Sequence, residues 1–250
     1  MKPHLGKTKF KIMLKIENLS KYYYHKPVLK NVTLKIRKGD VVAVMGKNGA
    51  GKSTLLKIVS SLVIPNKGTL QLNSEDITPH NYKIRKDLLY MGHEPGFYSA
   101  YTCVENLLFC SNLYNLNQPI SVINKVLDKA GLKCMKNKPI RFFSQGMLQR
   151  LKIAAVNLIP WKLLLFDEPF NGLDGEGKQI FNSMISNWKS LGKTMIFVSH
   201  KIDWVLNTCS RVIVLDNSSI VIDKPTSIEL ESVLENILYK MVPIKVLNKC

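Results

Sequence analysis

A glycine-rich stretch, GKNGAGKST at residues 46–54, restricts the possible folds of this chain more than any other feature. Its first eight residues fit the pattern G-x-x-x-x-G-K-[ST]. Directly before it, Val41–Met45 (VVAVM) is short and wholly apolar, which is typical of a buried parallel strand. A helical pattern follows from Lys52 to Leu62. The sequence therefore predicts a strand, a tight loop and a helix, as found where helices pack on a parallel sheet.

The loop itself predicts a phosphate site. Glycines let the backbone curl so that successive N–H groups point inward, and the start of the helix adds partial positive charge. We expect Lys52 to reach the β- and γ-phosphates of a nucleotide and the Ser53 hydroxyl to ligate Mg²⁺. An ordinary glycine-rich turn is the alternative. The expected nucleotide-binding residues of the loop are Gly46, Lys47, Asn48, Gly49, Ala50, Gly51, Lys52, Ser53 and Thr54.

Two carboxylates follow a second buried run, Leu163–Phe166 (LLLF). An aspartate at the end of such a strand lies at the carboxyl edge of the sheet, beside the phosphate loop, where Asp167 can hold Mg²⁺ through water. Glu168 points differently and is predicted to polarise an attacking water. Two carboxylates that cap the next helix are the alternative. The pair favours a hydrolytic site over one that only holds a nucleotide.

His200 follows a third buried run, Thr194–Val198 (TMIFV). Because parallel strands end at one edge of the sheet, we expect His200 near the same phosphate. A neutral imidazole there can hydrogen-bond the γ-phosphate and the water, so His200 is a catalytic candidate beside Glu168. A structural histidine is the alternative.

The order of elements predicts an α/β fold of the P-loop NTPase type with a parallel-sheet core. Residues 13–19 and 30–36 alternate as strands and form an N-terminal antiparallel β portion, and residues 175–191 are helical. Residues 211–215 and 220–222 read as a final hairpin over 217–219. Between Arg85 and Val156 the pattern gives helices at 103–116, 120–130 and 145–158 and no buried strand. We expect this block, about 86–156, to be an inserted helical subdomain.

Net charge and cysteine content restrict the possible functions less than the motifs do. The net charge of +18 suits nucleic acid or an anionic membrane surface, or reflects a lysine bias spread over the whole surface. The five cysteines show no CxxC spacing and are expected to be reduced thiols, with a metal site or disulfides as the alternative.

No apolar run is long enough for a transmembrane helix. Residues 1–12 are basic and lack the apolar segment of a secretory signal, and they are expected to be a loose extension or to follow from an upstream start.

Taken together, these motifs resemble the ATP-binding subunit of an ABC transporter, over residues 13–225, with 226–250 as a C-terminal helical tail. The resemblance implies ATP and Mg²⁺ as cofactors. It makes residues 46–53 the Walker A loop, Asp167 the Walker B acid, Glu168 the catalytic glutamate and His200 the switch histidine. Two further nucleotide-contacting residues are implied: Asp174, from the D-loop Gly172-Leu173-Asp174, and Tyr23, which falls where an aromatic stacks on adenine.

The family's signature LSGGQ corresponds to Phe143-Ser144-Gln145-Gly146-Met147, which keeps Ser144 and Gly146 but not the first glycine or the final glutamine. In the family these residues bind the nucleotide of the other subunit. The implied active form is a homodimer, arranged head to tail, with ATP at the interface. A plain N-cap role for Ser144 is compatible with this.

A departure from the family occurs at residues 91–96 (MGHEPG), where the family usually has a glutamine that touches Mg²⁺ and water. Either His93 or Glu94 stands there, and counting back from residues 104–106 favours His93 as a candidate at the metal.

The stretches LLYMGHEPGFYSAYTCVENLLF (88–109) and FSQGMLQRLKIAA (143–155) resemble the haem-exporter (CcmA-like) ATPase branch of cytochrome c maturation. A drug or lipid exporter ATPase is the alternative.

The resemblance implies separate transmembrane permease subunits and contact with the membrane surface. It also implies a peripheral location on the cytoplasmic side of the inner membrane, or on the matrix side in an organelle. No specific nucleic-acid partner is expected. A soluble nucleic-acid ATPase is disfavoured because no second nucleotide domain, coiled coil or zinc motif is present. A module that no longer hydrolyses ATP is disfavoured by Glu168 and His200.

Overall fold

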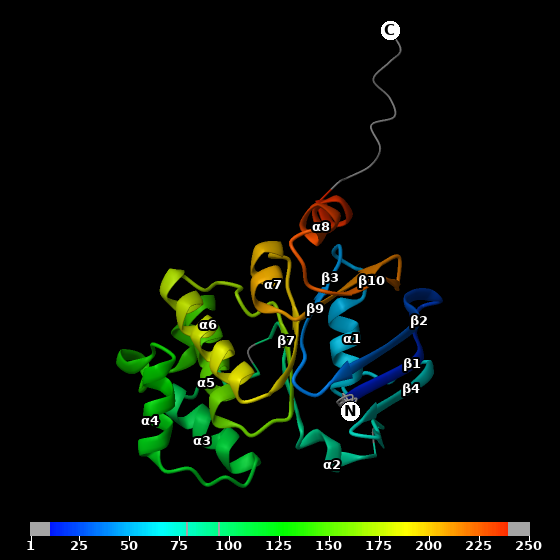
Figure 1. Cartoon of the computed structure of the whole chain (residues 1–250). Coiled ribbons are helices and arrows are strands. Elements are labelled where there is room, and N and C mark those ends of the chain that lie inside the picture. Colours follow the sequence, from blue (N-terminus) through cyan, green and yellow to red (C-terminus); the bar gives the residue numbers. More distant parts are fainter. Residues whose placement is uncertain (1–10, 79, 95, 240–250) are drawn as a thin grey trace, which may run out of the picture.

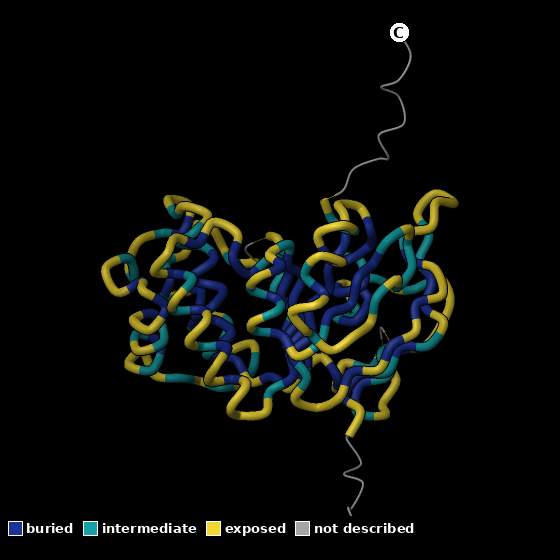
Figure 2. Tube along the Cα trace, turned by 45° about the horizontal axis from the view of Figure 1, so that its top comes forward, coloured by how far each residue is buried: buried dark blue, intermediate teal, exposed yellow. Residues whose placement is uncertain are grey.

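The computed structural model describes residues 11–78, 80–94 and 96–239. The predicted extension (residues 1–10 of it) and residues 240–250 of the predicted tail lie outside the described residues. Within the described residues, two sheets lie beside a group of helices (Figure 1). Figure 2 shows the buried segments in the interior of the molecule and the exposed segments around its outside.

The first sheet is antiparallel and has the order β2-β1-β4-β5. Apolar and polar residues alternate along much of it, so that Ile16, Leu34 and Ile36 are buried while their neighbours are at least partly exposed. This confirms the predicted N-terminal antiparallel portion. Its strands are β1 (Ile12–Tyr23), β2 (Lys26–Arg37), β4 (Lys67–Leu72) and β5 (Glu75–Asp76).

The second sheet has the order β10-β9-β3-β8-β7-β6, and all pairs except β10 with β9 are parallel. This confirms the predicted α/β class with a parallel-sheet core. Its strands are β3 (Val41–Met45), β6 (Leu88–Met91), β7 (Leu163–Asp167), β8 (Thr194–Val198), β9 (Arg211–Asp216) and β10 (Ser219–Pro225). The carboxyl ends of β3, β7 and β8 lead into the phosphate loop, Glu168 and His200 respectively, so the topology brings these segments to one edge.

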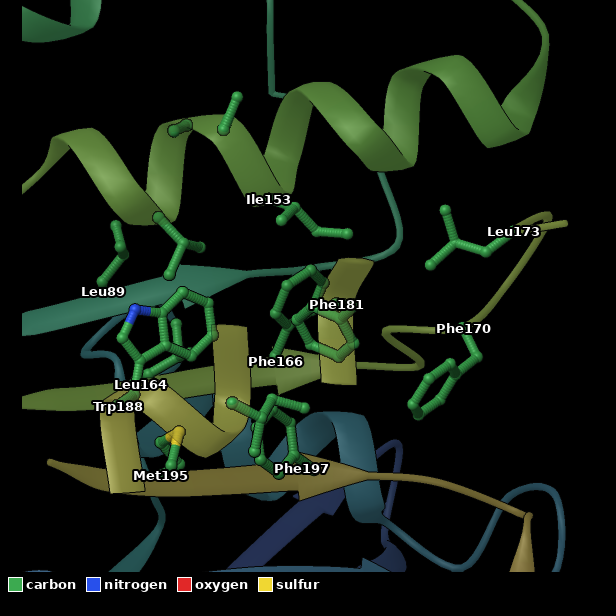
Figure 3. Close-up of a cluster of buried hydrophobic side chains, with 14 of the residues drawn as sticks. Leu89, Ile153, Leu164, Phe166, Phe170, Leu173, Phe181, Trp188, Met195 and Phe197 are labelled. Atoms are coloured by element: carbon green, nitrogen blue, oxygen red, sulfur yellow. The ribbon is translucent and has the colours of Figure 1, made fainter. Parts of the chain in front are cut away.

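Helices cover both faces of the parallel sheet. Helix α1 (Lys52–Val59) and the antiparallel sheet share a core with Val42, Val44, Leu163 and Leu165 on one face. On the other face, α5 (Gln145–Leu158) and α6 (Gly175–Ser190) pack on Leu164, Phe166 and Phe197. Figure 3 shows Phe181 of α6 against the rings of Phe166 and Phe197, with Ile153 of α5 on the other side of the Phe181 ring from Phe197. Strands buried on both faces explain the continuous apolar runs in the sequence.

The remaining helices surround this core. Helices α3 and α4 pack with α5, and α8 packs on α7. Their bounds are α2 (Tyr82–Arg85), α3 (Cys103–Leu113), α4 (Ile120–Lys129), α7 (Ile202–Thr208) and α8 (Leu230–Tyr239), with short 3₁₀ turns at Lys133–Met135 and Ile140–Phe142. Among the described residues, no helix combines the length and apolarity that crossing a membrane requires.

One prediction is wrong. The pattern predicts no buried strand between Arg85 and Val156, yet β6 lies there and pairs in parallel with β7. Only Leu88 and Leu89 of its four residues are buried, and a run that short has no period from which a strand can be distinguished from a helix. Strands β4 and β5 are absent from the sequence interpretation, and α1 ends at Val59 rather than at Leu62.

Candidate nucleotide site

The glycine-rich loop connects β3 directly to α1, and its glycines are required by both conformation and space. Gly51 at the N-cap of α1 has φ 97°, and a Cβ atom there would lie 2.5 Å from the carbonyl oxygen of Val28. A Cβ atom at Gly46 would lie 2.2 Å from the carbonyl oxygen of Leu215. The loop therefore adopts a left-handed turn pressed against neighbouring strands, which only glycine permits at these two positions.

Lys52, the first residue of α1, folds back over this loop. Its ammonium donates hydrogen bonds to the carbonyls of Gly46 at 2.8 Å and Lys47 at 2.9 Å. Burial lowers the pKa of Lys52, while the nearby carboxylates Glu168 and Asp167 oppose that shift. A cation held over a loop of backbone N–H groups is suited to bind a polyphosphate.

Asp167 is the last residue of β7 and is buried, whereas Glu168 leaves the strand in a left-handed conformation. Glu168 has φ 51°, and its backbone N–H donates to the carbonyl of Val198 on β8 at 3.1 Å. Such a conformation costs a non-glycine residue roughly 1–2 kcal/mol. Both carboxylates line the pocket over the phosphate loop, and Asp167 alone of the two also lines the larger cavity beside it.

The carboxyl of Glu168 is protonated far more readily than an exposed glutamate. Burial and the negative charge of Asp167 raise the pKa of Glu168 to about 7, against the opposing effects of Lys52 and Lys201. A carboxyl with a pKa near neutral pH can accept a proton from water and release it again.

His200, two residues after β8, brings its imidazole to this carboxyl. Its Nε2 atom lies 3.0 Å from Oε1 of Glu168, although the approach lacks the geometry of a hydrogen bond. Burial and the charge of Lys52 lower the pKa of His200, with Asp167 opposing. The hydroxyl of Tyr239 on α8 donates to the carbonyl of His200 at 2.8 Å. The lowered pKa favours the neutral imidazole near pH 7, so His200 meets the Glu168 carboxyl without a positive charge of its own.

These predicted residues share one concave surface. A pocket of about 170 Å³ lies over the phosphate loop. A larger cavity of about 520 Å³ adjoins it and is lined by Ser53, His93, Glu94 and Asp167, so the loop at 92–94 reaches the same place. The smaller pocket is lined by Asn48, Gly49, Gly51, Lys52, Ser53, Thr54, His93, Asp167, Glu168, Val198 and His200.

The other predicted contact residues lie outside both pockets. Tyr23 ends β1 and is 42% exposed, with the ammonium of Lys21 5.0 Å from its ring centroid. Ser144 caps α5 by accepting from the N–H of Met147 at 3.3 Å, which confirms the N-cap interpretation. Gly146 approaches Gly172 so closely that a Cβ atom would lie 2.4 Å from its carbonyl oxygen.

Asp174 caps the adjacent helix α6. It accepts from the N–H of Gly177 at 2.8 Å and pairs with Arg150 at 2.8 Å. These contacts hold Ser144, Gly146 and Asp174 together, at the start of α5 and α6. Within the described residues, none of the three lines the pocket at the phosphate loop.

The sequence interpretation missed the polar side chains of α5. Gln149 donates to the carbonyl of Pro169 at 2.7 Å, and Lys152 donates to the carbonyls of Gly92 at 2.6 Å and His93 at 3.0 Å. All three of Gln149, Arg150 and Lys152 are buried. A signal was present, because Lys152 stands between the apolar Leu151 and Ile153 in residues 149–156, the part of the helix that is buried, and a buried ammonium needs a partner.

Comparison with known proteins agrees with this geometry. The model of the ABC transporter family matches residues 29–171. The chain is 35% identical over 215 residues to the lantibiotic transport ATP-binding protein SrtF of Streptococcus pyogenes, covering 85% of this chain and 90% of SrtF. It is 30% identical over 189 residues to the cytochrome c biogenesis ATP-binding export protein CcmA of Vibrio vulnificus, covering 76% of this chain and 92% of CcmA.

The fold matches solved structures as well. The dimeric ATP-binding cassette MJ0796, bound to ADP and Pi, has a TM-score of 0.79 and 25% identity, covering 86% of this chain and 99% of that one. The fold and site therefore define an ATP-binding cassette. The chain belongs to the ABC transporter family and is an ATPase of the transporter type.

Proposed function

We propose that this chain is the ATP-hydrolysing subunit of an ABC transporter that powers export through separate membrane subunits. The observation that carries the proposal is the contact of Glu168 with His200 in a pocket floored by the phosphate loop. A carboxyl with a pKa of about 7 beside a neutral imidazole suits proton transfer from water. Loop residues 46–54 bind the phosphates, and Tyr23 stacks on the adenine.

Mg²⁺ fits the oxygen donors that line the cavity beside this pocket. The hydroxyl of Ser53 and the buried carboxylate of Asp167 line it together, and Mg²⁺ prefers such hard oxygen ligands. The nitrogen of His93 is a poorer ligand for Mg²⁺, so we assign His93 to a water of the metal. Bound Mg²⁺ would neutralise charge on the phosphate oxygens. Ser53 and Asp167 would hold it, His93 would hold it through a bound water, and Glu168 and His200 would act on the attacking water.

The second half of the site comes from another copy of the chain. Ser144, Gly146 and Asp174 lie together but away from the phosphate loop, which supports a head-to-tail homodimer in which they face the partner's ATP. The dimeric state of the MJ0796 cassette supports the same arrangement. Binding of ATP would close this dimer and hydrolysis would reopen it.

The membrane partners are proposed from the relatives. SrtF and CcmA are by name a transport and an export ATP-binding protein, which supports permease subunits on separate chains. We assign the chain a peripheral place on the cytoplasmic side of the inner membrane, or on the matrix side in an organelle. The +18 charge then serves the membrane surface, and no specific nucleic acid is bound.

A narrower proposal is haem export in cytochrome c maturation. It is favoured by the sequence Tyr90-Met91-Gly92-His93, which replaces the usual glutamine loop with the pattern of that branch. The 30% identity to CcmA supports it, while the 35% identity to SrtF supports a different exporter equally well. The cargo is chosen by the membrane subunits, so the two alternatives differ in partner rather than in site.

The experiment is a gentle-detergent pull-down of the tagged chain from its native membranes, with the co-purifying proteins identified and ATP turnover measured. Multispanning subunits together with haem-handling maturation proteins would support the narrower proposal. A different pair of permease subunits would overturn only that branch. Recovery of nucleic acid without membrane proteins would overturn the transporter proposal. A Lys52→Ala preparation is the matched negative control for turnover.

A further inference from the structure

Helix α5 carries a lysine whose charge is almost completely removed from solvent. Lys152 is 4% exposed and lies between the buried apolar residues Leu151 and Ile153. Burying an ammonium is unfavourable unless acceptors are supplied. Two acceptors are supplied here, the carbonyl oxygens of Gly92 at 2.6 Å and His93 at 3.0 Å, from a loop about sixty residues away in sequence.

The two acceptors belong to the loop that brings His93 to the nucleotide site. Lys152, His93, Asp167 and Glu168 together line a small cavity of about 80 Å³, and the last three of these residues also line the pocket over the phosphate loop. The ammonium holds this loop through backbone atoms, which leaves the imidazole of His93 at the pocket over the phosphate loop. Lys152 is therefore placed to set the position of His93, while His93 and not Lys152 lines the pocket over the phosphate loop.

The same helix also holds the other side of the site. Gln149 is one turn earlier on α5 and donates to the carbonyl of Pro169, the residue after Glu168. Helix α5 begins at the Ser144 cap, close to Gly146. One rigid helix thus contacts the loop of His93, the loop of Glu168 and the surface that we assign to the partner's ATP.

We propose that Lys152 is the positioning residue through which α5 fixes His93 relative to Asp167 and Glu168. This inference rests on the proposed function, because His93 has a role there only if the site hydrolyses ATP. In that setting, a change at the start of α5 reaches His93 through the ammonium of Lys152. A neutral side chain of the same length would leave the two carbonyls without their donor and the loop of His93 without its anchor.

A double-mutant cycle tests this directly. Turnover, the KM for ATP and the Mg²⁺ concentration for half-maximal activity are measured for the full chain and for Lys152→Met, His93→Ala and the double variant. We expect Lys152→Met to lower kcat roughly tenfold and to raise the Mg²⁺ requirement, with the KM for ATP within about twofold. The double variant should be no slower than His93→Ala alone, because both changes remove one function. Lys152→Arg should retain most of the activity, since a guanidinium also donates two hydrogen bonds.

Ile153→Val, which shortens a buried apolar side chain of the same helix and leaves both hydrogen bonds of Lys152 in place, is the control. The fold-changes in kcat caused by Ile153→Val and by His93→Ala should multiply when the two changes are combined. If the effects of Lys152→Met and His93→Ala multiply as well, or if Lys152→Met has wild-type kinetics, the inference is wrong. If Lys152→Met does not fold, the same cycle is run with Lys152→Gln. An inactive wild-type chain would instead overturn the proposed function, so the two failures are distinguishable.

Discussion

The Nε2 atom of His200 lies 3.0 Å from the Oε1 atom of Glu168, across the edge of the parallel sheet where β7 and β8 end. Both side chains are partly buried, and burial is the largest cause of the pKa shift of each. Burial raises the pKa of Glu168 to about 7 and lowers that of His200. Near neutral pH the imidazole is neutral, and the carboxyl is divided between its two protonation states.

Because His200 faces the carboxyl rather than the loop backbone, its removal should affect turnover more than binding. We expect His200→Ala to lower kcat by roughly 10²-fold, the size typical of a lost proton-transfer partner. The KM for ATP should change by less than about threefold. The matched control is His80→Ala, which removes an exposed histidine and should leave turnover unchanged. An equal loss in both variants would contradict a role for His200.

The raised pKa of Glu168 also predicts a stability effect in the protein free of nucleotide and Mg²⁺. A carboxyl whose pKa rises from 4.5 in the unfolded chain to about 7 in the folded chain destabilises the fold as pH rises through that window. Glu168→Gln, which does not ionise, should therefore raise the free energy of unfolding above wild type at pH 8, by up to about 3 kcal/mol. At pH 4.5 the two proteins should be nearly equal.

Thermal melts in EDTA at both pH values measure this difference. Because the two proteins are compared at the same pH, the contributions of all other titrating groups to the free energy of unfolding cancel in the difference. Equal melting temperatures at pH 8 would show that Glu168 ionises as freely as an exposed glutamate.

The close contact of Gly146 with Gly172 predicts a separation of ATP binding from dimerisation. A Cβ atom at residue 146 would lie 2.4 Å from the carbonyl oxygen of Gly172, so Gly146→Ala must displace the D-loop backbone. We expect ATP affinity to stay within about twofold while ATP-dependent dimerisation weakens at least roughly tenfold. Gly175→Ala is the control, because no atom lies within 4 Å of its added Cβ. Analytical ultracentrifugation with and without ATP measures both variants.

Helix α8 should contribute to the stability of the cassette although it lies beyond residue 225. Leu234 is fully buried, and α8 packs on α7, which directly follows His200 and Lys201. Leu234→Ala should lower the free energy of unfolding by about 2–4 kcal/mol. Ile228→Ala, at a residue that is 85% exposed, should change it by less than about 0.5 kcal/mol. Denaturant unfolding of the two variants makes the comparison, and equal midpoints would mean that α8 is not part of the folded unit.

Much of the site could be predicted from sequence because its residues follow strands with strong patterns. The runs at 41–45, 163–166 and 194–198 are wholly apolar, and a parallel sheet buried on both faces is what such runs require. Their carboxyl ends meet at one edge, so Lys52, Asp167 and His200 converge by topology alone.

The parts of the fold and the site that the sequence does not predict depend on contacts between segments far apart in the chain. Strand β6 has only two buried residues and becomes a strand because β7 offers it hydrogen-bonding partners. The left-handed conformation of Glu168 accompanies a hydrogen bond from its N–H to the carbonyl of Val198, thirty residues away, and no local pattern encodes it. Likewise, the bond from Lys152 to the carbonyl of Gly92 joins residues sixty positions apart. A sequence can show that a buried lysine needs an acceptor, but not which backbone atom supplies it.

The most direct test of the central claim compares wild type with Glu168→Gln for Mg²⁺-dependent ATP turnover and for the size of the ATP-bound species in gel filtration. If Glu168 is the base of a head-to-tail dimer, the variant loses at least about 10²-fold in turnover. It then elutes as a stable dimer with ATP, whereas wild type returns to monomer as ATP is consumed. Turnover equal to wild type, or an ATP-bound variant that remains monomeric, would contradict the account.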